Sequence, residues 1–468
     1  MLPFALWKGG DRKRELKNMQ DEINYYDDYK LLGYLLMEEN NMKKIFAAML
    51  IVFMAVGSAY AVDIDVTGND KIRGNYYDNV GSINSDSDRG THMFYDHEID
   101  INPTVNISDA TKIIMQLELN DATWTAQHQG HTSGDVNDDI RVEYIYGSHT
   151  FSTGTEFWGG QMAVGQWGYK FGDTEVPGWR ARINQPLGGG TLIFILQKIV
   201  EAQDDSSTTA IAPVEGENSE DKDADAYLLG WTGKVGDITI SPLIYYVQNG
   251  TTNTDLGSSD TDNTWVLDMA ADGQHGMLGW EAEFIYMTTA MDGTNAVAGN
   301  DVDDQNVWGA YAGVNFNLGA VTPGLKIAYG SYSKDDGNFA YGADYDAGQL
   351  MIFDEDVGFG PGVADPTTEN IMGATTVMAY ADFNVNDALS FYGGLAYLMS
   401  NSSDDGPWKD ASAYELDLKG TYKFTENVSY HVDLGYAAID WNSDPRDATI
   451  TDDPDGITKI QHYLKIEF

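Results

Sequence analysis

The sequence predicts an all-β protein, namely a transmembrane, antiparallel, up-and-down β-barrel. Three observations predict it: extended segments of about 9–15 residues recur along the chain, their connections alternate between short and long, and polar and apolar side chains alternate within the segments. Strands of that length cross a membrane when they are tilted. No stretch beyond residue 61 is apolar enough for a transmembrane helix.

Eighteen such segments follow one another from residue 62 to residue 468, which we assign to one barrel domain. A count of sixteen stays open if 178–186 or 260–271 is not a strand. Barrels of about 16–18 strands leave an aqueous channel. The predicted strands are 63–77, 92–107, 110–121, 139–149, 156–168, 178–186, 190–202, 223–234, 236–249, 260–271, 275–289, 304–318, 321–333, 371–384, 387–400, 411–424, 427–440 and 456–468.

The connections between these segments are sorted by length. The tight turns fall at Ser108-Asp109, Gly188-Gly189, Val235, Gly319-Ala320, Asn386-Asp387 and Thr425-Glu426. The longer polar stretches are 79–91, 122–138, 203–222, 250–259, 290–303, 334–370, 401–410 and 441–455. An antiparallel membrane barrel has this alternation, with short turns at its periplasmic end and long loops outside.

The two faces of the predicted strands differ in polarity. In the segment 411–424, Leu416 and Leu418 alternate with Glu415 and Asp417. Because successive strand side chains point to opposite faces, we expect an apolar exterior and a polar interior. Aromatic residues near strand ends are typical of the girdles at the two lipid–water interfaces, although strand propensity alone also favours them.

The polarity pattern does not show which face of one segment points into the barrel. Residues 190–202 (GTLIFILQKIVEA) are apolar on both faces. We expect this segment to lie either against a neighbouring protomer or beneath a loop that folds inward.

Composition excludes several functions. The chain has a formal net charge of −46 and no cysteine. Such acidity offers no basic surface for nucleic acid, and it attracts cations. No G-x-S-x-G or H-E-x-x-H motif is present, so we expect neither an enzyme nor catalytic residues.

The amino-terminal region contains a secretory signal peptide at residues 42–61. Lys43 and Lys44 precede an apolar run, and a small-residue site predicts cleavage after Ala61. Residues 1–41 precede this signal and do not fit any structural role. We therefore expect translation to begin at Met42 and the upstream segment to be a mis-start.

The final residues, HYLKIEF, carry a resemblance to a known family. Terminal Phe468 follows Tyr463, Leu464 and Ile466, and the ending resembles the membrane-insertion signal of Gram-negative outer-membrane porins. The stretch 117–124 (LELNDATW) is similar, more narrowly, to trimeric porins of sulfate-reducing and related bacteria. The resemblance implies a homotrimer in the cell outer membrane that contacts lipid, lipopolysaccharide and the barrel-insertion machinery, and that lets small hydrophilic solutes diffuse passively.

One feature departs from the family. In general porins a long third external loop folds inward and constricts the pore, whereas the third external connection here, 169–177, is short. Either the strand count is wrong by a hairpin, or another loop narrows this pore.

Charged residues could set the selectivity of the pore. Porin constrictions place acidic loop residues opposite basic wall residues. The candidates for this arrangement are Arg141, Glu143, Asp173, Glu175, Arg180, Arg182 and Glu118. Arg180 and Arg182 are two apart and so share a face. The alternative is that these residues line a wet wall and pair locally, which contributes little.

No metal or cofactor is expected, with loop-bound calcium as the open alternative. The acidic runs around Asp86, Asp138, Asp303 and Glu355 supply oxygen ligands, but none has the spacing of a known calcium loop. His128 and His131 lack a third ligand.

These observations favour a porin for ions and small hydrophilic solutes that prefers cations. A substrate-specific outer-membrane channel is the first alternative, and a barrel that acts as a scaffold for a partner protein is the second. Conductance across a lipid bilayer separates a pore from a silent scaffold.

Overall fold

The computed structural model describes residues 62–79, 91–124, 140–165, 167–169, 176–200, 223–249, 262–290, 305–333, 337–338, 350–353, 373–401, 410–440 and 456–468. Within these residues there is no helix long and apolar enough to cross a membrane. The predicted upstream segment and signal peptide, the acidic runs, and His128 and His131 lie outside the described residues.

The described residues form twenty strands. They are β1 (Asp63–Asp78), β2 (Thr91–Ser108), β3 (Thr111–Thr123), β4 (Ile140–Thr150), β5 (Glu156–Val164), β6 (Val176–Leu187), β7 (Gly190–Val200), β8 (Ala224–Val235), β9 (Ile238–Asn249), β10 (Asp262–His275), β11 (Leu278–Ala290), β12 (Gln305–Phe316), β13 (Val321–Gly330), β14 (Tyr332–Ser333), β15 (Gly337–Asn338), β16 (Ala374–Asn384), β17 (Leu389–Ser400), β18 (Ser412–Lys423), β19 (Val428–Asp440) and β20 (Ile457–Glu467).

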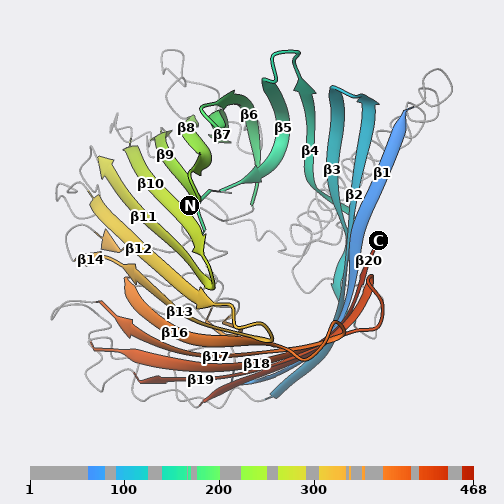
Figure 1. Ribbon diagram of the computed structural model, residues 1–468, viewed down its shortest axis with the longest axis vertical. Coiled ribbons are helices and arrows are strands. Elements are labelled where there is room, and N and C mark those ends of the chain that lie inside the picture. The colour runs from blue at the N-terminus through green and yellow to red at the C-terminus, as the bar shows by residue number, and fades with distance from the viewer. Residues whose placement is uncertain are drawn as a thin grey trace, which may run out of the picture. The chain divides into compact units, whose positions relative to one another are not determined.

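Eighteen of these strands close into one antiparallel sheet, and β14 and β15 pair separately. Each barrel strand pairs with its neighbours in the chain, and β1 pairs with β20 to close the ring, from Asn69 opposite Glu467 to Asp78 opposite Thr458. Figure 1 shows blue β1 beside red β20. The prediction of 18 strands is confirmed, and the two doubtful segments are β6 and β10.

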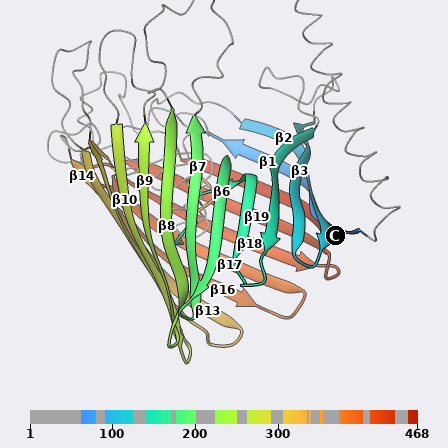
Figure 2. The same cartoon turned by 90° about the horizontal axis from the view of Figure 1, so that it is seen from above.

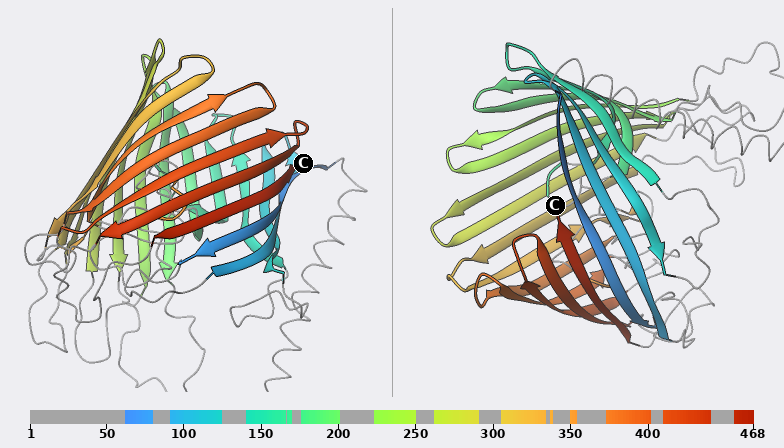
Figure 3. Two further views of the ribbon diagram at one scale, coloured as in Figure 1. Left: turned by 90° about the horizontal axis from the view of Figure 1, so that it is seen from below. Right: turned by 90° about the vertical axis from the view of Figure 1, so that its right-hand side faces the viewer.

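The strands are tilted and their short turns share one end. In Figure 2 the near strands β7–β9 cross the far strands β16–β19 at a large angle, as the walls of a closed barrel do. Figure 3 shows the tight hairpin turns together at one end of the barrel. Gly188 and Gly189 form the turn between β6 and β7 with φ of 63° and 82°, a conformation that glycine adopts without strain.

The outer face is apolar, as predicted. On β18, Leu416 and Leu418 are 44% and 50% exposed, whereas the alternating Glu415 and Asp417 are both 0% exposed. Large exposed hydrophobic side chains occur at corresponding alternate positions of the other described barrel strands.

The inner face is not uniformly polar. A hydrophobic cluster forms around residues 350–353, which come from the connection between β15 and β16. The inner positions that meet this segment are small on several neighbouring strands and include Ala374, Ala396, Ala413 and Ala437. Short side chains leave room for the segment inside the barrel, which accounts for the departure from an all-polar interior.

The doubly apolar segment is β7, and its inner side chains lie beneath an inward loop. Ile193 and Ile195 are buried with Leu228 and Leu243, and Trp167 from the β5–β6 connection packs on this cluster. Of the two orientations left open by the sequence, the structure shows the folded-in loop.

Candidate functional site

The first inward segment is Trp167–Tyr169, from the connection between β5 and β6. Trp167 Nε1 donates to the Ser241 carbonyl on β9 at 3.1 Å, and the Tyr169 N–H donates to Glu283 Oε2 on β11 at 2.5 Å. The Tyr169 hydroxyl donates to Asp272 on β10. The short third external connection therefore still reaches the inner wall of strands β9–β11.

Two features hold this segment in place. Gly168 has a φ of 73°, and a Cβ atom there would lie 2.5 Å from Glu283 Oε1, so glycine permits the close approach. Burial, and then the hydrogen bond to Asp272, raise the pKa of the Tyr169 phenol. The hydroxyl therefore keeps its proton and remains a donor at neutral pH.

The second inward segment is Leu350–Phe353, which is at most 2% exposed. Glu415 Oε1 accepts the N–H groups of Met351 at 2.6 Å and Ile352 at 2.8 Å, and Glu415 Oε2 accepts that of Phe353 at 3.0 Å. Lys459 Nζ donates to the Met351 carbonyl at 3.1 Å. One wall carboxylate thus binds three consecutive backbone amides, which makes this a strongly anchored loop.

An acidic patch lies on the inner face of β10 and β11. It consists of Asp268, Asp272, Glu281 and Glu283, of which Asp268 and Glu283 are buried. Register places Asp272 opposite Glu281 and Ala270 opposite Glu283, so all four side chains share the face on which Tyr169 binds. The patch creates a negative field inside the barrel.

Arg180 and Arg182 lie on the inner face of β6. Their neighbours Trp179 and Ile183 are exposed on the outer face. Arg180 Nε and Nη2 donate to Gln197 Oε1 at 2.9 and 2.8 Å, and its Nη1 donates to the Ala163 carbonyl.

Arg182 donates to Asn184 Oδ1 at 2.7 Å and stacks 4.6 Å above the Trp158 ring. As their two-residue spacing predicts, both arginines lie on one face of β6, the inner wall. Each donates hydrogen bonds to uncharged groups there.

A charged seam joins β1 to β2. Arg73 pairs with Asp96 at 2.6 Å and with Glu98 at 2.9 Å, and Lys71 pairs with Glu98 at 2.8 Å. Because Tyr77 on the same face of β1 pairs in register with buried Lys459, this seam faces the interior. The charged residues alternate as K-x-R on β1 and as D-x-E on β2, a pattern visible in the sequence. None of these residues is among the predicted site residues.

The remaining predicted site residues are not brought together with Arg180. Arg141 pairs with Glu143 at 2.8 Å and its side chain is 55% exposed, while Glu118 lies opposite Arg141 in register. Asp173 and Glu175 lie outside the described residues.

The proposed insertion signal occupies both faces of β20. Phe468 is 52% exposed, and Leu464 and Ile466 alternate on the same side. Tyr463 lies on the inner face, stacked on His431 with ring centroids 4.3 Å apart.

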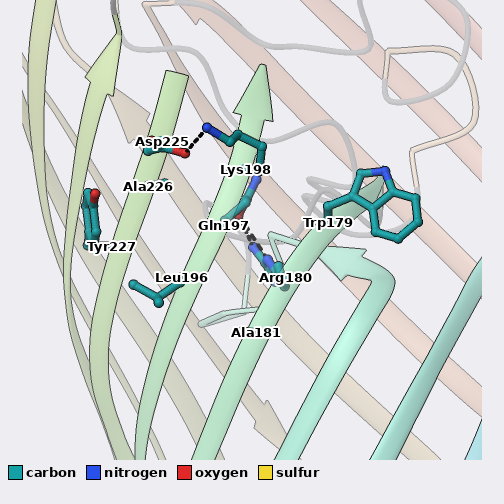
Figure 4. A pocket seen from close by; sticks show the side chains of 9 residues that line it. All are labelled: Trp179, Arg180, Ala181, Leu196, Gln197, Lys198, Asp225, Ala226 and Tyr227. Carbon is teal, nitrogen blue, oxygen red and sulfur yellow. Dashed lines mark hydrogen bonds and ion pairs between the residues drawn. The ribbon is translucent and has the colours of Figure 1, made fainter. Parts of the chain in front are cut away.

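An open pocket of about 360 Å³ lies on β6–β8. Figure 4 shows Trp179 and Tyr227 at its two sides, with Lys198 paired to Asp225 between them. Trp179 is 60% and Tyr227 42% exposed, which places the pocket on the outer face. Lys198 contacts both Asp223 at 2.9 Å and Asp225 at 3.1 Å, so the group is not a basic site.

Among the described residues, no group of three or more histidine, cysteine, aspartate or glutamate side chains could hold a metal ion. The acidic runs considered for calcium lie beyond these residues.

Solved outer-membrane porins have the same fold. A BenF-like porin from Pseudomonas fluorescens Pf-5 has a TM-score of 0.53 at 11% identity, with 86% of this chain and 98% of that chain covered. OccK2 (OpdF) of Pseudomonas aeruginosa, in complex with glucuronate, also gives 0.53 at 11% identity, over 86% and 98% of the two chains. OccAB3 of Acinetobacter baumannii gives 0.51 at 10% identity, over 86% and 100%.

At such identities the likeness establishes the fold. No family model matches the sequence, and no curated protein matches it. The narrower resemblance to porins of sulfate-reducing bacteria has no support among these structures.

Proposed function

We propose that this chain is an outer-membrane porin that forms a water-filled channel for passive diffusion of ions and small hydrophilic solutes. One observation carries the proposal: a closed 18-strand barrel with an apolar outer face encloses charged walls and two anchored inward segments. A lipid bilayer can surround such an exterior, and the inward segments narrow an aqueous interior that no helix of the described residues fills.

The channel favours cations. Support comes from the acidic patch on β10 and β11 and from the net charge of −46. Fixed negative charge at a constriction raises the local concentration of cations and lowers that of anions.

Reversal potentials across planar bilayers in a potassium chloride gradient test this selectivity. We expect potentials of the sign that marks cation preference, and they should decrease in concentrated salt because the field is screened. The double variant Asp272→Asn/Glu281→Gln should lose part of the preference, whereas Glu426→Gln, in an exposed turn, should not. Anion preference in the unmodified protein contradicts the charge argument.

A substrate-specific channel is the second candidate, supported by the pairing of Arg182 with Trp158 on the inner wall. Among the solved structures, OccK2 binds glucuronate and OpdK binds vanillate. A cation beside an aromatic face can hold a small organic acid. Liposome swelling with glucuronate, vanillate and uncharged sugars of similar size distinguishes a substrate-specific channel from a general pore. Faster entry of the acids, lost in Arg180→Ala/Arg182→Ala, favours a substrate-specific channel. Entry ordered by size alone favours a general pore.

We further propose that the barrel assembles as a homotrimer in contact with lipopolysaccharide and that the insertion machinery recognises the residues up to Phe468. Cross-linking in native membranes tests the trimer. A protein that inserts but conducts no current would favour the scaffold alternative.

A further inference from the structure

The two inward segments rest on the same arrangement of wall residues. Beneath each lies a glutamate that accepts backbone N–H donation from the segment: Glu283 accepts one N–H, from Tyr169, and Glu415 accepts three, from Met351, Ile352 and Phe353. Beside each glutamate lies an aspartate in contact with it, Asp268 and Asp417 respectively. The two pairs lie on different strands, β10 and β11 for the first and β18 for the second, so they are separate sites.

Both aspartates are buried. Asp268 is 4% and Asp417 0% exposed, and within the described residues none of the four oxygens of these two carboxyl groups has a hydrogen bond of ordinary geometry. A buried ionised carboxylate without a partner is costly, and two touching carboxylates cannot both stay ionised away from water. A proton on the aspartate removes both problems, because its O–H then donates to the neighbouring glutamate, which keeps its remaining lone pairs for the backbone amides.

We propose that one proton shared within each carboxyl pair holds the inward segment above it, so that the width of the channel depends on pH. This inference rests on the proposed function for its conductance readout. In the released state, water reaches the pair and both carboxyl groups ionise. The docked state therefore binds one proton more per segment, and a rise in pH favours release.

The surroundings favour a proton over a metal ion. A Cβ atom on Gly435 would lie 3.1 Å from Asp417 Oδ1, 3.2 Å from Met351 Cβ and 3.4 Å from Ile352 Cδ1, so the site is closely packed. Calcium requires six to eight oxygen ligands at about 2.3–2.6 Å, and among the described residues no group of three or more acidic or histidine side chains is placed to hold a metal ion. A proton requires neither space nor further ligands.

Other charged and titratable groups surround each pair. The described groups that face the Asp268–Glu283 pair are Asp272, Glu281, Tyr169, Tyr245 and Tyr311. Those around the Asp417–Glu415 pair are Tyr392, Lys419, Asp433 and Lys459. The acidic neighbours of the first pair oppose a second negative charge there, and the lysines at the second pair offset only part of the repulsion.

Single-channel conductance of the full chain between about pH 5 and about pH 9 tests the proposal. We expect the conductance of the unmodified protein to rise with pH as the segments leave the lumen. In Asp268→Asn/Asp417→Asn, each amide donates permanently to its glutamate, so conductance should stay at its acid value. Asp382→Asn removes one inner-wall charge that has no described contact with either segment, and it should keep the rise.

A second readout does not depend on conduction. The chain has no cysteine, so Ile352→Cys places a single thiol on the buried second segment. Its rate of reaction with a small water-soluble thiol reagent should rise with pH. Ionisation of the thiol contributes equally to this rise in Ile352→Cys and in Ile352→Cys/Asp417→Asn. A steeper rise in Ile352→Cys therefore measures release of the segment.

Three results overturn the proposal: conductance that does not change with pH, a double variant that keeps the full rise, or equal labelling in the two cysteine proteins. A change in conductance on adding calcium or a chelator at fixed pH, as large as the pH effect, would assign the pairs to a cation instead. If no current appears at all, the proposed function fails, while the labelling rates still decide whether the pairs hold a proton.

Discussion

The indole ring of Trp167 packs against the bare backbone of Gly230, where a Cβ atom would lie 2.2 Å from the ring atom Cη2. Gly230 lies on β8, at the edge of the apolar cluster that includes Ile193 and Leu228. The absence of a side chain at this inner position creates the space into which the first inward segment fits.

Substitution of Gly230 should therefore release that segment. In Gly230→Ala the new methyl group and the indole cannot occupy the same space, and overpacking of this kind costs about 1–3 kcal/mol. The ratio of docked to released segment should fall roughly 5- to 150-fold. We expect a larger single-channel conductance.

Gly147→Ala is the matched control for this experiment. Gly147 is also a strand glycine, but no atom lies within 4 Å of its Cβ position. Unchanged conductance in both variants would show that Trp167 does not narrow the channel.

Removal of Glu415 should free the second inward segment. Glu415→Ala deletes the acceptor for three backbone N–H groups, and hydrogen bonds to a charged group contribute about 1.5–3 kcal/mol each. The buried amides of Met351, Ile352 and Phe353 would then need water. We expect rapid proteolytic cleavage near this segment and a larger conductance.

Glu426→Ala controls for the loss of a glutamate, because Glu426 is exposed in the β18–β19 turn. If Glu415→Ala resists protease as well as this control does, the apolar cluster alone holds the segment.

The strands were predictable because a barrel wall is governed by local rules. Alternation of Leu416 and Leu418 with Glu415 and Asp417 fixes the two faces of β18, and glycine pairs such as Gly188-Gly189 mark the turns. The same rule placed Arg180 and Arg182 on one face of β6.

The inward segments could not be predicted in this way. Glu415 meets the amides of Met351–Phe353 across 62–64 residues of sequence, so the contact depends on barrel closure and not on local pattern. One signal was present: Leu350–Phe353 is a purely apolar run inside a long polar connection. An apolar run in such a loop must find an apolar surface, and the inner alanines of β16–β19 provide it.

Arg73 should moderate the cation preference of the channel. It contacts two carboxylates, Asp96 at 2.6 Å and Glu98 at 2.9 Å. Arg73→Ala leaves the carboxylates of Asp96 and Glu98 with one cationic partner among the described residues, Lys71 at Glu98, so reversal potentials should shift toward stronger cation preference at low salt. Arg73→Lys retains the charge and should give the reversal potential of the unmodified protein. A shift of equal size in Arg73→Lys would mean that packing, and not charge, causes the effect.

Arg182 provides a second test of the same field, because it lies on the inner wall without a described carboxylate in an ion pair. Its guanidinium stacks on Trp158 and donates to Asn184, so its positive charge acts on permeating ions through the lumen. Arg182→Ala should lower chloride permeability and increase cation preference. Arg182→Lys is the matched control, since it keeps a positive charge at the same position of β6. A shift of equal size in Arg182→Lys, measured by reversal potential in the same salt gradient, would assign the effect to the lost stacking on Trp158 and not to the charge.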